Sequence, residues 1–236
     1  MERVQLQSAY ILHQRPWRDT SALIEAFTRA HGRIGLVARG VRRRSARLKT
    51  TLQPFQPLLL SWTGRGDLAT LTDAEGTGTP IALTGSRLLC GFYVNELVIR
   101  LLHRHDPHAE LFDDYARCLM DLTDAANEEI ALRLFEKRLL AACGYGLNLT
   151  QDIACDQSVR ADAHYEYILE QGPCEASVDS AAPLFPGSSL LALAEDRLDD
   201  EQVRRDAKRL LRGALDLYLG DKPLKTREVL RGMRKR

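Results

Sequence analysis

The spacing of apolar residues in this chain changes near residue 85, and that change constrains the fold more than any other feature. Before it lie five short runs rich in apolar and β-branched residues, of the kind that form strands. They read VQLQSAYIL, SALIEAFTR, RIGLVARGV, QPFQPLLLSWTG and LATLTDAEG. No helical segment separates them, although parallel neighbours need a long crossover connection. Five such strands in about eighty residues predict a small antiparallel barrel of the OB type over residues 1–80.

Glycine and proline positions fit this barrel. The second and third runs are separated by Ala-His-Gly, which suits a hairpin turn with Gly32 at positive φ. Pro54 and Pro57 precede the fourth run, where a strand begins or lies at an edge. The segment around Trp17, RPWRDTS, is predicted to be a loop.

Residues 81–236 predict a helical domain, so the fold class is α+β. Its first helix, SRLLCGFYVNELVIRLLHRH, is apolar nearly all round, as a central helix is. A later helix begins near Asn127 and stops at Gly144, and the last begins near Thr226. Residues at about 150–187 lose helical spacing and predict a small irregular or β lobe, with YEYIL as a short strand.

Charge is distributed very unevenly along a chain whose net charge is only +1. Residues 1–66 carry +9, residues 67–196 carry −14 and residues 197–236 carry +6. Six cations and no acid fall within one short stretch between the third and fourth strands: Arg39, Arg42, Arg43, Arg44, Arg47 and Lys49. A solvated surface run is the simpler explanation, but clustered like charges repel and add nothing to folding. OB barrels bind nucleic acid across a strand face flanked by loops, so we expect these cations to contact phosphates without reading sequence.

Two tryptophans lie near the basic stretch and are candidates for base stacking. Trp17 stands between Arg15 and Arg18, and these three form a secondary set of nucleic-acid-binding candidates. Trp62 falls on the fourth strand, where packing in the core is the more ordinary role.

Other motifs give little support for an enzyme or a metal site. The segment HRHDPH gathers His103, His105 and His108, but their spacing is poor for a shared metal and Pro107 ends the helix. Cys155 and Cys174 sit where a zinc ribbon has paired ligands, yet the positions three residues later are Ser158 and Ser177. Phosphate-loop, G-x-S-x-G and HExxH motifs are absent. We therefore expect a non-enzymatic binding protein with no cofactor and no zinc, and keep an OB-type RNA-binding factor and a metal-dependent hydrolase as alternatives.

The sequence also predicts a soluble protein of the cytoplasm. The N-terminus lacks an apolar signal core. The most apolar run, residues 88–102, contains Asn95, Glu96 and Arg100 and is too short to span a bilayer. The five scattered cysteines argue against a disulfide framework.

Six segments together resemble the RecO family of DNA recombination and repair mediators. They occur in the family's order along nearly the whole chain: AYILHQRPWRDTSALIEAFTRAHGRIGLVARGVRR, LQPFQPLLLSWTGRGDLATL, LLCGFYVNELVIRLL, DPHAELFDDY, ALRLFEKRLLAACGYGLNL and GDKPLKTREVLRG. The resemblance implies an N-terminal OB fold, a helical domain and a lobe that carries zinc in some members. Ser158 and Ser177 depart from the zinc-bearing pattern, so the resemblance implies a degenerate zinc-ribbon-like lobe without metal.

The resemblance also implies a function and partners. RecO-like proteins bind single- and double-stranded DNA, anneal complementary strands, contact the acidic C-terminal tail of single-stranded-DNA-binding protein (SSB) and, with RecR, help load RecA. We accordingly expect action at the nucleoid. An acidic tail with an apolar end would bind an apolar groove with a cationic rim. The helical domain offers these rim candidates: Arg133, Lys222, Lys225 and Arg227.

Overall fold

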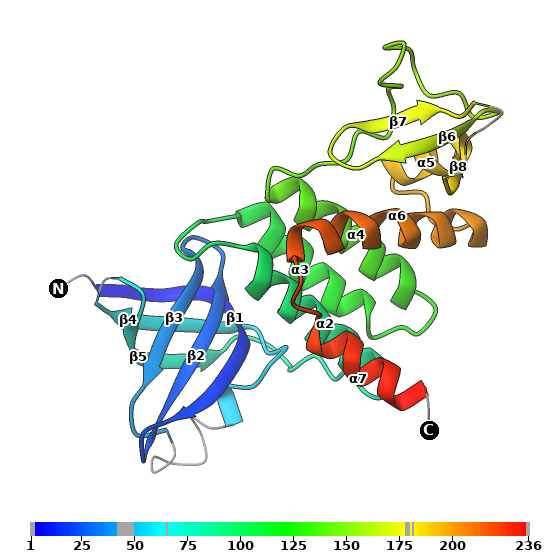
Figure 1. Cartoon of the computed structure of the whole chain (residues 1–236). Helices are drawn as coiled ribbons and strands as arrows, with labels where there is room; N and C mark the ends of the chain where they lie inside the picture. Colours follow the sequence, from blue (N-terminus) through cyan, green and yellow to red (C-terminus); the bar gives the residue numbers. More distant parts are fainter. Residues whose placement is uncertain (1–2, 42–49, 65, 178–179, 181, 235–236) are drawn as a thin grey trace. The chain divides into compact units, whose positions relative to one another are not determined.

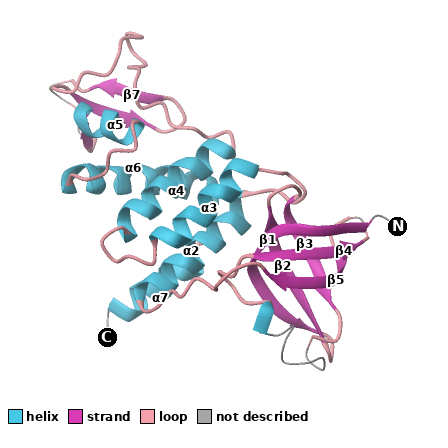
Figure 2. Ribbon diagram, turned by 180° about the vertical axis from the view of Figure 1, so that it is seen from behind, coloured by secondary structure: helices cyan, strands magenta, loops and turns pink. Residues whose placement is uncertain are grey.

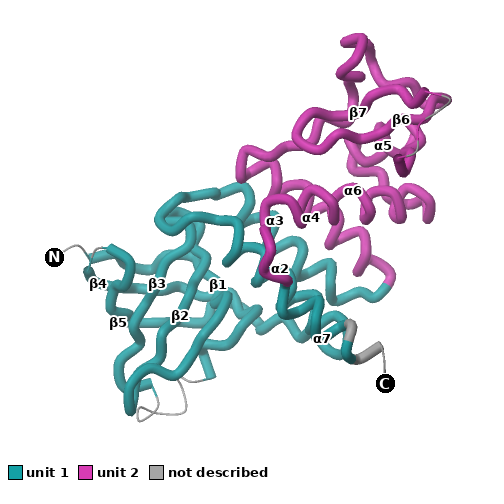
Figure 3. The backbone as a smooth tube through the Cα atoms, viewed as in Figure 1, with its two compact units in different colours: residues 1–125, 224–236 teal, residues 126–223 magenta. Residues whose placement is uncertain are grey.

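The computed structural model describes all residues except 1–2, 42–49, 65, 178–179, 181 and 235–236. The chain forms two compact units. Unit 1 contains residues 1–125 and 224–236, and unit 2 contains residues 126–223 (Figure 3).

Five strands of unit 1 close into the barrel that the sequence predicts, in the order β1-β2-β3-β5-β4 (Figure 1). They are β1 (Arg3–Trp17), β2 (Ser21–Thr28), β3 (Gly32–Ala38), β4 (Leu58–Thr63) and β5 (Ala69–Gly76). One detail differs from a purely antiparallel barrel: β3 and β5 pair in parallel, at Leu36 with Ala69 and Val37 with Thr70. The reason is topological, because β4 pairs with β1 and β5 then turns back to close the barrel beside β3.

The first strand makes closure possible because it is long enough to serve two partners. Residues 3–9 of β1 pair with β4, and residues 9–17 pair with β2. The strand continues through Pro16 to Trp17, so the expectation of a loop around Trp17 is wrong. In the described structure only β2 pairs with β1 over residues 13–17, and a proline is tolerated where one side of a strand lacks a partner.

The barrel interior is a closed apolar core. It is filled from all five strands, and Trp62 belongs to it with 5% of its surface exposed. The β2–β3 hairpin turns as predicted at Gly32, whose φ is 63°. A side chain there would also collide with the backbone of Asp106, which explains the glycine.

The described part of unit 1 also contains the helices α2 (Ser86–Leu101), α3 (Ala109–Asp121) and α7 (Lys225–Arg234). Asn95 of α2 is buried and ties α2 and α3 to the barrel. Its side-chain amide donates to the Leu12 carbonyl (2.9 Å) and accepts from the Tyr115 hydroxyl (2.6 Å). Glu96 of the same helix accepts from the backbone amides of Lys225 and Thr226 at the start of α7. The C-terminal segment thereby joins the unit that holds the barrel.

Unit 2 combines helices with a small sheet. It contains α4 (Glu128–Ala142), β6 (His164–Ile168), β7 (Gly172–Glu175), β8 (Leu184–Pro186), α5 (Gly187–Ala194) and α6 (Glu201–Leu219). The strands form an antiparallel sheet in the order β7-β6-β8, and β6 confirms the strand predicted at YEYIL. Figure 2 shows this sheet beside α5, which packs in turn on α6. Gly144, with φ of 83°, follows the end of α4 as predicted.

Candidate nucleic-acid interface

The basic segment, Arg39–Lys49, follows β3 in the sequence, and the described residues on both sides of residues 42–49 belong to the barrel. Val41 and Leu52 are both buried among the barrel's apolar residues. Five of the six cations predicted there lie outside the described residues: Arg42, Arg43, Arg44, Arg47 and Lys49. The sixth, Arg39, is described and exposed, directly after β3.

Strand register brings the secondary candidates to the same end of the barrel as Arg39. Trp17 pairs with Ser21, and Pro16 pairs with Ala22, which pairs with Ala38. The turn from β1 to β2 therefore adjoins the point where the basic segment leaves β3. Arg15 and Trp17 are two residues apart on one strand and so project from the same face, away from the core. Alternation through Pro16 predicts the common face of Arg15 and Trp17, whereas the pairing of β2 with both β1 and β3 brings these residues to the end of the barrel where Arg39 lies.

The outer face of β1 and β2 is divided into a covered part and an open part. Tyr10 and Phe27, paired across the strands, pack against Phe112 and Tyr115 of α3 with ring centroids 5.1–5.8 Å apart. Beyond the bulge at Leu12, the face continues to Arg15 and Trp17. A helix thus covers one half of this face, and the half next to the basic segment carries exposed side chains.

Among the described residues, three arginines at the barrel are already bound to acids. Arg29 makes a two-pronged ion pair with Asp113 at 2.8 and 3.1 Å, which raises the pKa of the arginine and lowers that of the carboxyl. Glu25 accepts from Arg33 (3.1 Å) and from Arg104. Burial lowers the pKa of Arg33, and the neighbouring charge of Arg104 also acts in that direction. These arginines hold the barrel and the α2–α3 region of unit 1 together.

Arg15, Arg18 and Arg39 differ from these structural arginines. Within the described part of the chain, none of the three has an acidic partner, and all three are exposed. We call this group, with Trp17, the barrel-end patch. Its cations are available to a polyanion without breaking an ion pair, which is what a phosphate-binding surface requires.

Trp17 is the aromatic residue of the barrel-end patch. Its side chain is 39% exposed, and the guanidinium of Arg18 lies 6.0 Å from its ring centre. Arg18 adopts φ of 51° in the turn, a conformation uncommon for residues with a side chain. Trp62, by contrast, is buried and packs edge-on against His31 (5.2 Å), so it is not placed to stack a base.

The predicted partner-binding cations do not form one set. Arg133 is buried in unit 2 and donates to Glu136 (2.6 Å), so it does not form a solvent-facing rim. Lys222 is exposed at the end of unit 2. Lys225 and Arg227 belong to α7 of unit 1, where Arg227 lies 5.7 Å from the ring centre of Tyr93. The exposed cations Lys222 and Lys225 keep their predicted role as a proposal.

The metal candidates lack a ligand cluster. No group of three or more His, Cys, Asp or Glu suited to a metal occurs among the residues that the structure describes. His108 contacts Asp106 (3.1 Å), whereas His103 and His105 are exposed. Cys155 is exposed and Cys174 is half-buried, and burial and the charges of Asp152 and Glu166 raise the pKa of the Cys174 thiol. The absence of zinc stays a prediction, and metal analysis of the purified protein tests it.

No helix in the described part of the chain is long and apolar enough to cross a membrane.

Comparison with known proteins adds a family to this geometry. Residues 1–80 match the family model "Recombination protein O N terminal", and residues 83–228 match "Recombination protein O C terminal". The chain is 50% identical to DNA repair protein RecO of Nitrosococcus oceani over 234 residues, covering 99% of this chain and 95% of that protein. It is 45% identical to DNA repair protein RecO of Methylococcus capsulatus (97% and 94% covered) and 48% identical to that of Alkalilimnicola ehrlichii (98% and 92% covered). The names of these relatives state DNA repair, and none of them mentions RNA binding or hydrolysis, the two alternatives that the sequence left open.

Proposed function

Because the chain belongs to the RecO family of DNA repair proteins, we propose that it is a recombination mediator that binds DNA and anneals complementary strands. A role in DNA repair and recombination follows from membership of this family. The expectation of a binding protein rather than an enzyme agrees with that role. In the proposed role it also contacts the acidic tail of SSB and acts with RecR to load RecA on coated DNA.

The barrel-end patch is the observation that carries the proposal. Three arginines without acidic partners among the described residues and one exposed tryptophan lie at the end of the barrel where β3 ends, and the other five cations follow β3 in the sequence. Two DNA strands repel each other through their phosphates. A surface that neutralises both backbones lowers this repulsion without contacting base edges, so annealing needs no ATP and no sequence preference.

The distribution of charge along the chain also supports DNA binding at the barrel. Residues 1–66 carry +9, whereas residues 67–196 carry −14 and would repel a polyanion. DNA is therefore expected at the barrel rather than at the acidic middle of the chain. An acidic protein tail needs cations too, and exposed Lys222 and Lys225 are the proposed contacts.

The deciding experiment is annealing of complementary strands coated with SSB, compared with strands coated with SSB that lacks its acidic tail. We expect annealing without ATP, and faster annealing when the tail is present. Failure with both coatings, or a requirement for ATP, would refute the mediator role. Lys222→Glu with Lys225→Glu should slow annealing only on strands coated with intact SSB.

The basic segment has a test of its own. Replacing Arg42, Arg43 and Arg44 with alanine should weaken binding to all DNA sequences alike. The salt dependence should fall by about 0.7–0.9 of a logarithmic unit for each phosphate that the variant no longer neutralises. An unchanged slope would show that the segment is only a solvated surface.

A further inference from the structure

Two free cysteines of unit 2 lie in segments that the fold brings together. Cys155 belongs to a turn at residues 152–156, and Cys174 belongs to β7. Cys155 is exposed and Cys174 is half-buried, so solvent reaches both thiols. Neither residue belongs to the barrel, and DNA binding does not explain their position.

A single buried carboxylate connects the neighbours of these two cysteines. One oxygen of Asp152 accepts from the Ala154 amide (2.7 Å), and the other accepts from the Glu175 amide (2.9 Å). Ala154 directly precedes Cys155, and Glu175 directly follows Cys174. Because the two oxygens belong to one carboxyl group, the residues that they bind are close together, and so are the cysteines.

The backbone of β7 also comes close to the turn on the other side of Cys174. The Ile153 amide donates to the Pro173 carbonyl (2.9 Å), so both neighbours of Cys174 are bound to the segment that holds Cys155. A Cβ at Gly172 would lie 3.1 Å from Cγ2 of Ile153, which shows how little space separates the two segments. The proximity of the cysteines is therefore built into the lobe by several contacts.

The surrounding charges distinguish the two thiols. Burial, followed by the charges of Asp152 and Glu166, raises the pKa of Cys174, and the charge of Cys155 acts in the same direction. Such an effect of one thiol on the other requires a short separation, in agreement with the hydrogen bonds. The thiolate is the reactive form of cysteine, so the exposed Cys155 reacts first with an oxidant from solvent and Cys174 is the second thiol.

We propose that Cys155 and Cys174 are a reversible redox site, which hydrogen peroxide converts into a disulfide. The Cys155 thiolate attacks a peroxide oxygen, the S–O bond forms as the O–O bond breaks, and the leaving hydroxide takes up a proton to give water. The Cys174 sulfur then attacks the Cys155 sulfur. The S–S bond forms as the S–O bond breaks, and the hydroxide leaves with the Cys174 proton as a second water. The two sulfurs lose two electrons, which reduce the peroxide, and a dithiol reverses the change by exchange.

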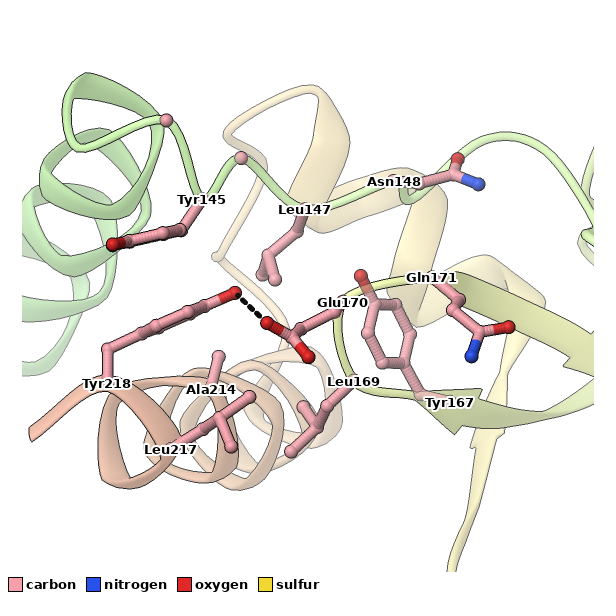
Figure 4. A pocket seen from close by; sticks show the side chains of 12 residues that line it. Tyr145, Leu147, Asn148, Tyr167, Leu169, Glu170, Gln171, Ala214, Leu217 and Tyr218 are labelled. Carbon is pink, nitrogen blue, oxygen red and sulfur yellow. Dashed lines mark hydrogen bonds between the residues drawn. The ribbon is translucent and has the colours of Figure 1, made fainter. Parts of the chain in front are cut away.

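The disulfide would also restrain one wall of a tyrosine-lined cavity of about 390 Å³ in unit 2 (Figure 4). The rings of Tyr145 and Tyr218 stack there with centroids 3.7 Å apart, and residues 167–171 form the wall at the end of β6. These wall residues lie inside the loop that a bond between Cys155 and Cys174 closes. Closing a loop restricts its opening, so oxidation should make this wall more rigid.

The test treats the full-length protein with hydrogen peroxide, blocks the remaining thiols with N-ethylmaleimide and identifies tryptic peptides by mass spectrometry. Cys155 lies in peptide 139–160 and Cys174 in peptide 161–197. We expect these peptides to be joined, with a mass lower by two hydrogens than their sum, and both thiols to return with dithiothreitol. Free thiols at both positions after peroxide, a disulfide between two protein copies, or sulfinic acid at Cys155 beside a free Cys174 would overturn the proposal.

A third cysteine of unit 2 provides the matched control. Cys143 shares its tryptic peptide with Cys155 but lies at the end of α4. Cys143→Ser should form the disulfide as the wild type does, whereas Cys155→Ser and Cys174→Ser should not form it. A joined pair of peptides in Cys155→Ser, or its loss in Cys143→Ser, would assign the bond to Cys143 and refute the site.

Hydrogen–deuterium exchange measures the effect on the lobe. Peroxide should slow the exchange of amides in residues 152–156 and 167–175 of the wild type and leave that of Cys174→Ser unchanged. Equal exchange in the reduced and oxidised wild type would overturn the restraint of the cavity wall. All three variants should anneal DNA under reducing conditions as the wild type does, which keeps this test distinct from that of the proposed function.

Discussion

Removing the three arginines of the barrel-end patch gives the sharpest test of where DNA binds. In the triple variant Arg15→Ala, Arg18→Ala, Arg39→Ala, each substitution removes a cation that has no acidic partner in the described structure. Each neutralised phosphate contributes about 0.7 to the salt slope on single-stranded DNA. With three fewer phosphates neutralised, the slope should fall by about 2.

The same relation gives the decrease in affinity. At about 0.1 M salt, a slope of about 0.7 per phosphate corresponds to roughly fivefold, or about 1 kcal/mol, for each arginine. The triple variant should bind about a hundredfold more weakly. Fluorescence anisotropy with a labelled oligonucleotide, repeated over a series of salt concentrations, measures both quantities.

A matched control distinguishes a local patch from net charge. Arg29→Ala removes one cation from the same barrel, but Arg29 is held by Asp113 in two hydrogen bonds. The salt slope of DNA binding by the Arg29→Ala variant should stay at the wild-type value. Binding at the patch is disproved if the triple variant keeps the wild-type slope, or if Arg29→Ala lowers the slope as much as each patch arginine does.

Three further predictions concern single residues. Trp17→Ala should weaken binding to single strands by about 1–3 kcal/mol, whereas Trp17→Phe should keep most of the affinity, in the same anisotropy assay. Asn95→Ala breaks two buried hydrogen bonds and should cost about 2–5 kcal/mol in urea unfolding followed by tryptophan fluorescence, since both tryptophans lie in the barrel. Asp196→Asn should cost up to about 1 kcal/mol at neutral pH, measured by circular dichroism, because Asp196 pairs with Lys137 and Arg138.

The pH dependence of the last prediction follows from the pKa of Asp196. Burial raises this pKa, but the hydrogen bond and charge of Lys137, with those of Arg138, lower it by more. The folded-state pKa is below the unfolded value, so the stabilisation is complete above about pH 4 and is lost as pH falls through the folded pKa. The unfolding free energies of Asp196→Asn and of the wild type should therefore become equal at lower pH. A difference in unfolding free energy between Asp196→Asn and the wild type that stays constant down to the lowest pH would contradict this origin. For Asn95→Ala, a loss of unfolding free energy below about 1 kcal/mol would contradict the role of the two hydrogen bonds.

The barrel and the helices could be predicted from sequence because the period of apolar residues is a local property. Alternation predicts strands, helical spacing predicts helices, and Gly32 and Gly144 mark a turn and a helix end where the structure has them. The concentration of cations in one segment is likewise visible without a structure. These features depend on neighbours within a few residues along the chain.

Other features depend on residues distant in sequence and became visible only in the folded chain. Pairing between β1, β2 and β3 places Arg15 and Trp17 beside Arg39, and it extends β1 through a proline that local rules assigned to a loop. Arg133 looks like a surface cation from its residue type, but the folded chain buries it and pairs it with Glu136. The tyrosine-lined cavity unites three segments spread over some seventy residues, so no sequence spacing announces it. Register and packing bring these side chains together, and both are set by long-range contacts.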